Sequence, residues 1–151
     1  MNEPLRRAVA LDPTAVTCTL VSLSCTTAWT DWAQGELWLC PDGLLRKSRG
    51  WLATVAGSLG SAGRFDHKNR PTRLIGDKER TRIAAAGNRN LWIRWDQIAS
   101  AKLQSGPMSH ALHLRLPDGR KVSLRWLRSD GSTDFLRSAL EEALGPRLAA
   151  G

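Results

Sequence analysis

The sequence predicts a mainly β domain: a bent antiparallel sheet or partly open barrel, capped by one amphipathic α-helix near its C-terminal end. Three observations carry this prediction. Several segments alternate apolar and polar side chains, which is the period of a half-buried strand. Pro-Asp-Gly, a strong turn signal, separates such segments at 41–43 and again at 117–119. The last apolar stripe, within 135–144, has helical spacing instead.

Three strands are expected in the first part of the chain. Residues 15–29 are rich in Thr, Val, Leu and Cys and alternate at 16–21, which suits a strand better than a helix. Residues 36–40 form the second expected strand. Residues 44–47 form the third, which returns after the turn at 41–43.

A long basic excursion from the sheet is expected at about 56–90. Residues 57–63 have the Gly- and Ser-rich composition of a linker, and residues 64–90 are polar and interrupted by Pro and Gly. We expect one or two short strands there, at 73–75 and 80–84. Loops of this length within a compact domain are usually functional or disordered.

The sheet is expected to resume at 91–95, and the hairpin 112–126 has the clearest alternation in the sequence. The final helix can be capped by Ser132 or Thr133, and Asp134 complements the helix dipole in its first turn. Gly145-Pro146 then ends it.

Length and composition predict a single domain. The chain has 151 residues, of which 42% are hydrophobic and 24% charged, and it contains no run of about 20 apolar residues that could span a membrane. We expect the domain at 14–145, a lead at 1–13 and a short tail at 146–151, in a cytoplasmic protein. Integral membrane proteins and small secreted scaffolds are excluded. The three cysteines are interpreted as small buried hydrophobes in a reducing compartment, and two could pair only if the fold brought them together.

Positive charge is concentrated in one segment. The net charge is +8, but residues 45–94 alone hold twelve basic and three acidic side chains. Such a segment attracts partners that carry phosphate. The candidate binding residues are Arg46, Lys47, Arg49, Trp51, Arg64, Lys68, Arg70 and Arg73. The alternative is a solvated, mobile loop whose charge serves solubility.

No catalytic, metal or cofactor site is expected. The sequence has no Gly-x-Ser-x-Gly elbow, no phosphate loop and no Cys-x-x-Cys pair. His110 and His113 are three residues apart, a spacing that would align them on a helix but not on the strand expected there.

The seven Trp residues have two interpretations. Period-two alternation places Trp95 and Trp126 in the core and Trp38 and Trp92 on an outer face, where Trp beside Arg is typical of interfaces. Alternatively, a strongly bent sheet has no clean outer face and buries all seven. The remaining three, near strand ends or loops, are Trp29, Trp32 and Trp51.

Three segments resemble the pleckstrin-homology (PH) superfold, in particular its bacterial PH and GRAM-like branch. Residues 35–45 are similar to the early hairpin of those domains, Ile93-Arg94-Trp95-Asp96-Gln97-Ile98 resembles their strand followed by Asp-x-Ile, and Leu112–Leu144 resembles their final hairpin and helix. The resemblance covers about a third of the chain. It implies a module that binds phospholipid headgroups, peptides or proteins. Because residues 26–36 hold no basic side chain, tight phosphoinositide recognition through the first two strands is not expected.

The resulting hypothesis is a non-enzymatic binding or adaptor module. A protein is the main expected partner, with peripheral contact to an anionic membrane surface as the other route. In the alternative hypothesis the chain binds nucleic acid, and its basic segment 64–94 follows a phosphate backbone. No small-molecule substrate is inferred.

Overall fold

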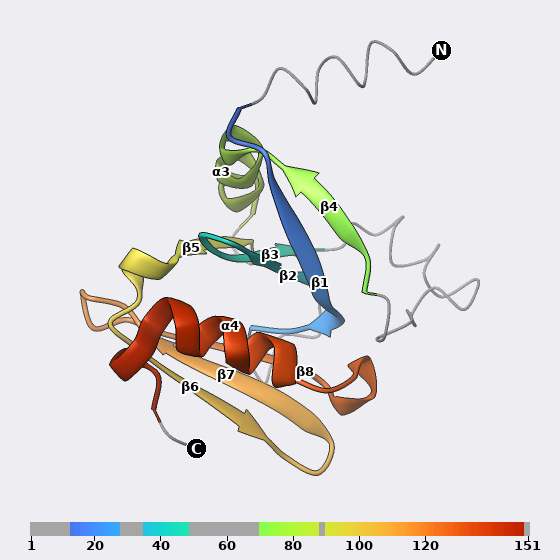
Figure 1. Ribbon diagram of the computed structural model, residues 1–151, viewed down its shortest axis with the longest axis vertical. Coiled ribbons are helices and arrows are strands. Elements are labelled where there is room, and N and C mark those ends of the chain that lie inside the picture. The colour runs from blue at the N-terminus through green and yellow to red at the C-terminus, as the bar shows by residue number, and fades with distance from the viewer. Residues whose placement is uncertain (1–12, 28–34, 49–69, 88–89, 150–151) are drawn as a thin grey trace.

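The computed structural model describes residues 13–27, 35–48, 70–87 and 90–149. It confirms the mainly β fold class: two antiparallel sheets, of five and three strands, with a helix near the C-terminal end (Figure 1). Among the described strands, the two sheets do not close into a barrel.

The five-stranded sheet has the order β4-β1-β2-β3-β5. Its strands are β1 (Val16–Cys25), β2 (Gly35–Cys40), β3 (Gly43–Ser48), β4 (Thr72–Ile75) and β5 (Leu91–Arg94). The turn at 41–42 joins β2 to β3 as predicted, and Gly43 lets β3 approach β5 closely. A Cβ atom at Gly43 would lie 2.8 Å from Arg94 Cα.

The three-stranded sheet has the order β6-β7-β8, with β6 at Ser100–Ser105, β7 at Ser109–Arg115 and β8 at Lys121–Leu127. Strand β1 connects the two sheets. Its register with β2 shifts after Leu20 and again after Ser22, and beyond its end Thr26 pairs with Arg125 of β8. The irregular register therefore lets one strand leave the first sheet and reach the second.

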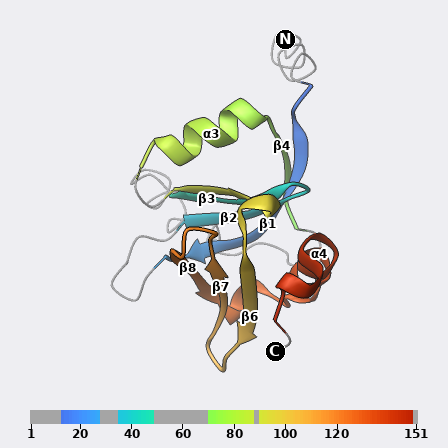
Figure 2. The same ribbon diagram turned by 90° about the vertical axis from the view of Figure 1, so that its left-hand side faces the viewer.

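Helix α4 (Asp134–Leu144) covers the main core, as its apolar stripe predicted. Leu136, Leu140 and Leu144 are fully buried against the side chains that point inward from both sheets. Each buried Leu contributes about 1.5–3 kcal/mol. The chain then turns at Gly145, and the Ala149 N–H donates to the Ala101 carbonyl at the start of β6 (Figure 2).

A second helix, α3 (Asp77–Ala85), corrects one prediction. The expected strand at 73–75 is confirmed as β4, but the one expected at 80–84 is helical. Lys, Glu, Arg and Ala favour a helix, and Asp77 and Glu79 complement its dipole in the first turn. Figure 2 shows α3 on one side of the first sheet, with the second sheet on the other side.

The first sheet consequently has two covered faces. On the α3 side, Ile83 and Trp92 pack against a second core cluster that is separate from the main one. Trp38, expected on an outer face, is a buried member of this cluster, which corrects that prediction. Trp126 is buried in the main core as predicted, whereas Trp95 and Trp92 are half-buried. Trp29, Trp32 and Trp51 lie outside the described residues.

Candidate functional site

The structure describes four of the eight predicted binding residues: Arg46, Lys47, Arg70 and Arg73. Arg49, Trp51, Arg64 and Lys68 lie outside the described residues. The four belong to separate places, because strand β3 and strand β4 are separated in the sheet by β1 and β2. The fold therefore does not bring them together as one surface.

Arg46 is inside the protein. It is 1% exposed, and its guanidinium donates to the Cys25 carbonyl at 2.9 Å and to Ser48 Oγ at 3.0 Å. Its neighbour Lys47 is half-buried opposite Glu36 of β2. These contacts tie β3 to the end of β1.

Arg70 holds the bend in β1. Its guanidinium donates to the carbonyls of Leu20 and Val21 and to those of Asp130 and Ser132, and it lies 4.2 Å from the centre of the Phe135 ring. Burial lowers the pKa of Arg70, while the nearby Asp130 raises it. The guanidinium thus links β1 to the segment that precedes α4.

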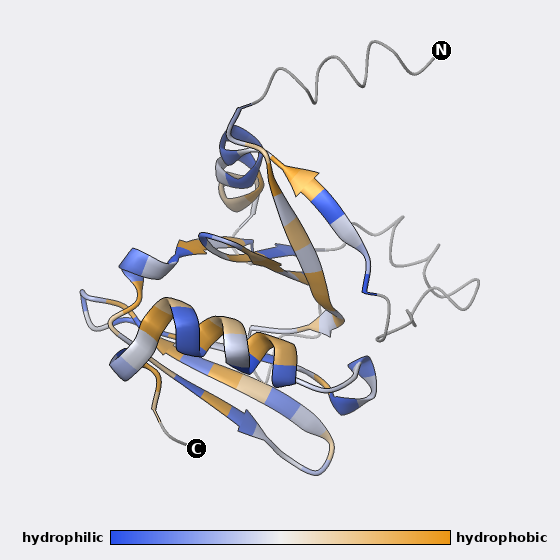
Figure 3. Cartoon of the chain, viewed as in Figure 1, coloured by the Kyte–Doolittle hydropathy of each residue, from blue (hydrophilic) through white to orange (hydrophobic). Residues whose placement is uncertain are grey.

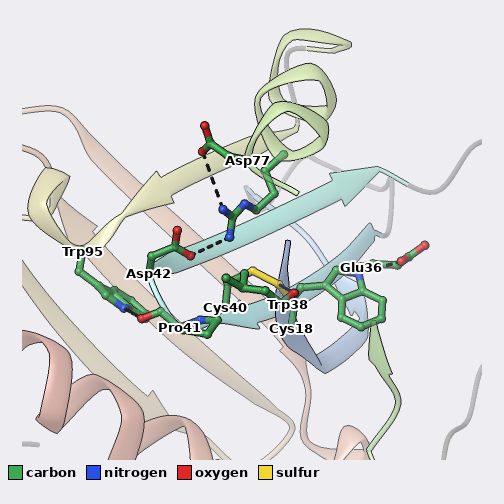
Figure 4. The surroundings of a disulfide bond; sticks show 10 residues. Cys18, Glu36, Trp38, Cys40, Pro41, Asp42, Asp77 and Trp95 are labelled. Carbon is green, nitrogen blue, oxygen red and sulfur yellow. Dashed lines mark hydrogen bonds and ion pairs between the residues drawn. A yellow bond between two sulfur atoms is a disulfide. The ribbon is translucent and has the colours of Figure 1, made fainter. Parts of the chain in front are cut away.

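Arg73 is exposed on β4 and pairs with Glu79 of α3 at 3.2 Å. Arg80 of α3, which was not among the predicted binding residues, is 1% exposed. It donates to Asp42 at 2.7 Å, lies 3.8 Å from Asp77 and stacks 4.3 Å from the centre of the Trp92 ring (Figure 4). Arg80 joins α3 to the β2–β3 turn.

Two of the three cysteines form a disulfide, which changes their expected role. Strands β1 and β2 pair Thr19 with Leu39, and this register places Cys18 across from Cys40, with their Cα atoms 4.3 Å apart (Figure 4). Cys25 is buried and is not part of this bond. The prediction of burial is correct for all three, but spacing in the sequence could not reveal the cross-strand contact.

A continuous basic surface lies on the outer face of the three-stranded sheet. We name it the basic face and define it by Lys102 of β6, Arg115 of β7, and Lys121 and Arg125 of β8. Strands β6, β7 and β8 contain no Asp or Glu. Figure 3 shows hydrophilic and hydrophobic residues alternating along these strands, so the basic side chains share one side while Leu103, Leu112 and Leu124 point to the core.

His113 lies in the middle of the basic face, where it pairs with Lys102 of β6 and Ser123 of β8. Its ring nitrogens contact Ser123 Oγ at 2.9 Å and Gln104 Oε1 at 3.1 Å. The pKa of His113 is lowered, first by burial and then by the positive charges of Arg125 and Lys102. Among the described residues, no ion pair involves Lys102, Arg115 or Lys121. Their charge is therefore available to a partner.

One Ser–His contact has the distances of a nucleophile and its base. Ser105 Oγ lies 3.0 Å from His110 Nδ1, and His110 Nε2 lies 3.1 Å from the Gly131 carbonyl. Because a carbonyl only accepts, Nε2 carries the proton and Nδ1 accepts from the serine. The adjacent Gly106 N–H donates to the Ser109 carbonyl, so it is not available as an oxyanion donor. The contact instead links the β6–β7 hairpin to the segment that precedes α4.

Metal sites and membrane-spanning helices are absent from the part of the chain that the structure describes. There, no cluster of His, Cys, Asp and Glu is placed to hold a metal ion. No helix in that part is both long and apolar enough to cross a bilayer.

Sequence reasoning missed the basic face because it summed charge along the chain. After residue 94 the chain has eight basic and six acidic side chains. The acidic ones lie on turns and helices, not on the three strands: Asp96, Asp118, Asp130, Asp134, Glu141 and Glu142. The signal was present in the alternation at 121–126, which already placed Lys121 and Arg125 on the outward side.

Solved structures that are similar to this chain include a domain of a protein from Leishmania infantum. The C-terminal domain of an unknown protein from Leishmania infantum, solved by crystallography, is 12% identical with a TM-score of 0.41, over 95% of this chain and 98% of that one. No family model and no curated protein matches the chain. Function is therefore inferred from the side chains of this chain alone.

Proposed function

We propose that the chain is a non-enzymatic, PH-like binding module that attaches peripherally to an anionic membrane surface. The order of elements supports the PH-like assignment: antiparallel strands, a late hairpin (β7–β8) and then one amphipathic helix that covers the core between the sheets. The segments that resemble PH domains coincide with β2, β3, β5, β7, β8 and α4.

The observation that carries the proposed function is the basic face. Four cationic side chains on one flat surface, without a carboxylate on its strands, form a local positive potential. Near an anionic leaflet each such charge contributes about 1 kcal/mol, so the face is sufficient for reversible attachment.

Two other partners could meet the same surface. A protein was the main partner expected from the sequence, and the basic face favours an acidic one. Nucleic acid is less favoured, because the described cations of 70–94 include Arg70 and Arg80, which are engaged within the fold. In addition, Trp126 of β8 points into the core, and β6 and β7 contain no Trp, Tyr or Phe, so His113 is the one ring on the basic face for base stacking.

Vesicle flotation tests the proposed function. Phosphatidylcholine vesicles with and without phosphatidylserine are floated with the wild type, with Lys102→Ala/Arg115→Ala/Lys121→Ala, and with a control in which three exposed cations of β4 and α3 are neutralised, Arg73→Ala/Lys78→Ala/Arg82→Ala. Both variants lose the same charge. We expect the first to bind anionic vesicles about a hundredfold more weakly, which corresponds to about 3 kcal/mol, and the control to bind almost normally.

Equal recovery of the wild type on neutral and anionic vesicles would overturn the membrane proposal. In that case, gel shifts with nucleic acid at low and moderate salt, and cross-linking to acidic proteins, would decide between the two alternatives. Equal loss in both variants would show that net charge, and not the basic face, drives attachment.

The proposed location is the cytoplasmic side of a membrane, with a condition set by the disulfide. Disulfides persist in oxidising compartments and are rare in the cytosol. A cytoplasmic protein is therefore expected to carry Cys18 and Cys40 reduced in its host. Acid quenching of whole cells, followed by alkylation of the denatured protein without reductant, would reveal three modified cysteines for a cytoplasmic protein and one for a protein from an oxidising compartment.

A further inference from the structure

Two large apolar side chains are exposed at one end of the basic face. Met108, in the β6–β7 turn, is 80% exposed, and Leu127, at the end of β8, is 48% exposed. Register pairs Ser109 with Leu127, and the Arg128 N–H donates to the Met108 carbonyl, so the two side chains come from neighbouring positions. Exposed apolar side chains of this size at a hairpin tip are typical of an interaction site.

The hairpin tip is held in place by hydrogen bonds. The Gly106 N–H donates to the Ser109 carbonyl at 2.8 Å and closes the turn, and the Arg128 guanidinium donates to the Gly106 carbonyl at 3.1 Å. The contact between Ser105 and His110 fixes the base of the hairpin. Met108 is thus presented on an ordered turn (β6–β7, Figure 1).

A polar cavity of about 630 Å³ lies directly behind this tip. The β6–β7 hairpin forms most of its wall, and three cationic side chains line it: Lys102 from β6, Arg125 from β8 and Arg137 from α4. Among the residues that the structure describes, no Asp or Glu lines it. The cavity has the charge and the size for a phosphate-containing group.

The spacing between the apolar tip and the cations fits a lipid interface. Arg125 is two residues from Leu127, about 7 Å along the strand. Lys102 is level with Ser123, which lies two residues further from Leu127 than Arg125 does, because both pair with His113. Apolar side chains of interfacial proteins enter about 5–10 Å into the boundary between headgroups and acyl chains. With Met108 and Leu127 at that depth, the cavity lies at the level of the lipid phosphates.

We propose that Met108 of the β6–β7 turn and Leu127 at the end of β8 insert into the membrane interface and that the cavity behind them binds the phosphate of an anionic lipid headgroup. The inference rests on the proposed function and defines how the module is oriented on the bilayer. A nucleic-acid backbone fits this end poorly, because it offers no apolar environment for the two exposed side chains.

An environment-sensitive fluorophore tests the orientation. Met108→Cys and Asp118→Cys are each labelled with NBD under native conditions, with the wild type as the control for labelling of the buried Cys25. Asp118 is the matched control because it is exposed in the β7–β8 turn, at the other end of β7. With phosphatidylserine-containing vesicles, we expect a blue shift and an intensity increase at position 108, and no change at position 118.

The outcomes separate this inference from the proposed function. Flotation of both labelled proteins without a spectral change at 108, or with an equal change at 118, overturns the hairpin inference and leaves membrane attachment intact. If neither protein floats while the unlabelled wild type does, Met108→Leu replaces the labelled protein. Normal flotation of Met108→Leu, together with loss of flotation in Met108→Asp, supports insertion of this side chain. Equal flotation of the two variants overturns the insertion. Absence of flotation for the wild type itself overturns both proposals.

Substitutions separate the two parts of the proposed site. Met108→Ser/Leu127→Ser is expected to weaken partitioning at least tenfold on anionic vesicles, while Met108→Leu/Leu127→Met restores it. Lys102→Ala/Arg137→Ala is expected to reduce the preference for phosphatidylserine over phosphatidylcholine at least tenfold, and Lys102→Arg is expected to retain it. Unchanged lipid preference in the double alanine variant would overturn the headgroup site.

Discussion

Arg80 is buried and contacts an aromatic ring, Trp92, with its guanidinium. We expect its substitution to destabilise the second core cluster. Truncation to alanine removes the contact with Trp92 and the charged hydrogen bond to Asp42, together with the packing of the side-chain stem. We expect Arg80→Ala to lower the free energy of unfolding by about 2–4 kcal/mol, and Arg80→Lys by about half of that. Urea unfolding measures both.

The matched control is Arg73→Ala, which removes an ion pair with Glu79 whose two side chains are 51% and 40% exposed. Exposed pairs contribute little, so a loss below about 1 kcal/mol is expected. Equal costs at the two positions would contradict the role of Arg80 as the link between α3 and the β2–β3 turn.

His110 makes stability depend on pH in a defined direction. Burial lowers its pKa below the ordinary value of about 6.5, although the Gly131 carbonyl opposes this shift. As pH falls through 6.5, the unfolded chain therefore takes up a proton before the folded one does. Stability is complete above this value and is lost towards lower pH, with a slope of at most about 1.4 kcal/mol per pH unit.

Urea unfolding at intervals from about pH 7.5 to about pH 5.5 measures this dependence. The variant His110→Gln should flatten the curve, whereas His113→Gln should change it less because His113 is more exposed. Carboxylates affect stability at lower pH; Asp118, whose pKa is lowered by its hydrogen bond from the Arg120 N–H, is one of them. A wild type that becomes more stable between pH 7 and pH 6 would contradict the sign.

At the scale of elements, the disulfide constrains the first sheet. It joins β1 to β2 across a sequence separation of 22 residues, and closing a loop of that size in the unfolded chain stabilises the fold by about 3 kcal/mol. Cys18→Ala/Cys40→Ala should lose about this amount and become insensitive to reductant. Denatured but unreduced wild type should titrate one thiol, from Cys25.

A count of three thiols in oxidatively refolded, denatured protein would contradict the cross-strand bond. The control is Cys25→Ala, which removes a buried thiol outside the bond. It should lose some stability, as a buried side chain does when it is shortened, and keep its sensitivity to reductant.

Periodicity predicted most of the elements and failed where a helix had few apolar residues. Strands β7 and β8 and helix α4 follow from clear periods of two and 3.6. Helix α3 contacts its core cluster mainly through Ile83 and the stem of Arg80, a residue that any hydropathy pattern counts as exposed. The sequence could therefore not show that a helix covered this face, and for the same reason Trp38 was assigned to an outer surface.

At the scale of the molecule, the candidate binding surface depends on which cations share a face of the fold, and not on the sum of charge along a segment. Residues 45–94 carry a net charge of +9, from twelve basic and three acidic side chains. Three of the described cations of this segment, Arg46, Arg70 and Arg80, bind within the fold, where they donate to carbonyl, hydroxyl and carboxylate groups. Meanwhile the nearly neutral C-terminal part presents the basic face, because its acidic residues lie on other elements. Only the pairing of β6, β7 and β8 brings its cations together.

The stability of the whole fold also depends on β4 and α3, although β1, β2, β3 and β5 pair with one another without them. Register pairs Arg46 with Leu91, so β3 and β5 could be joined by a short Asn-Gly turn after deletion of residues 49–89. We expect the shortened chain to self-associate and to bind a hydrophobic dye. The deletion uncovers Leu20, Trp38 and Leu45, whose burial contributes several kcal/mol to stability, and removes Arg70 from the bend of β1.

Adding Leu20→Thr, Trp38→Thr and Leu45→Thr to the deletion should restore a monomer, because the uncovered face is then polar. Size-exclusion chromatography measures this. A shortened chain that is monomeric without these substitutions, with unfolding like that of the wild type, would show instead that α3 is an accessory to the fold and that the first sheet tolerates an exposed second face.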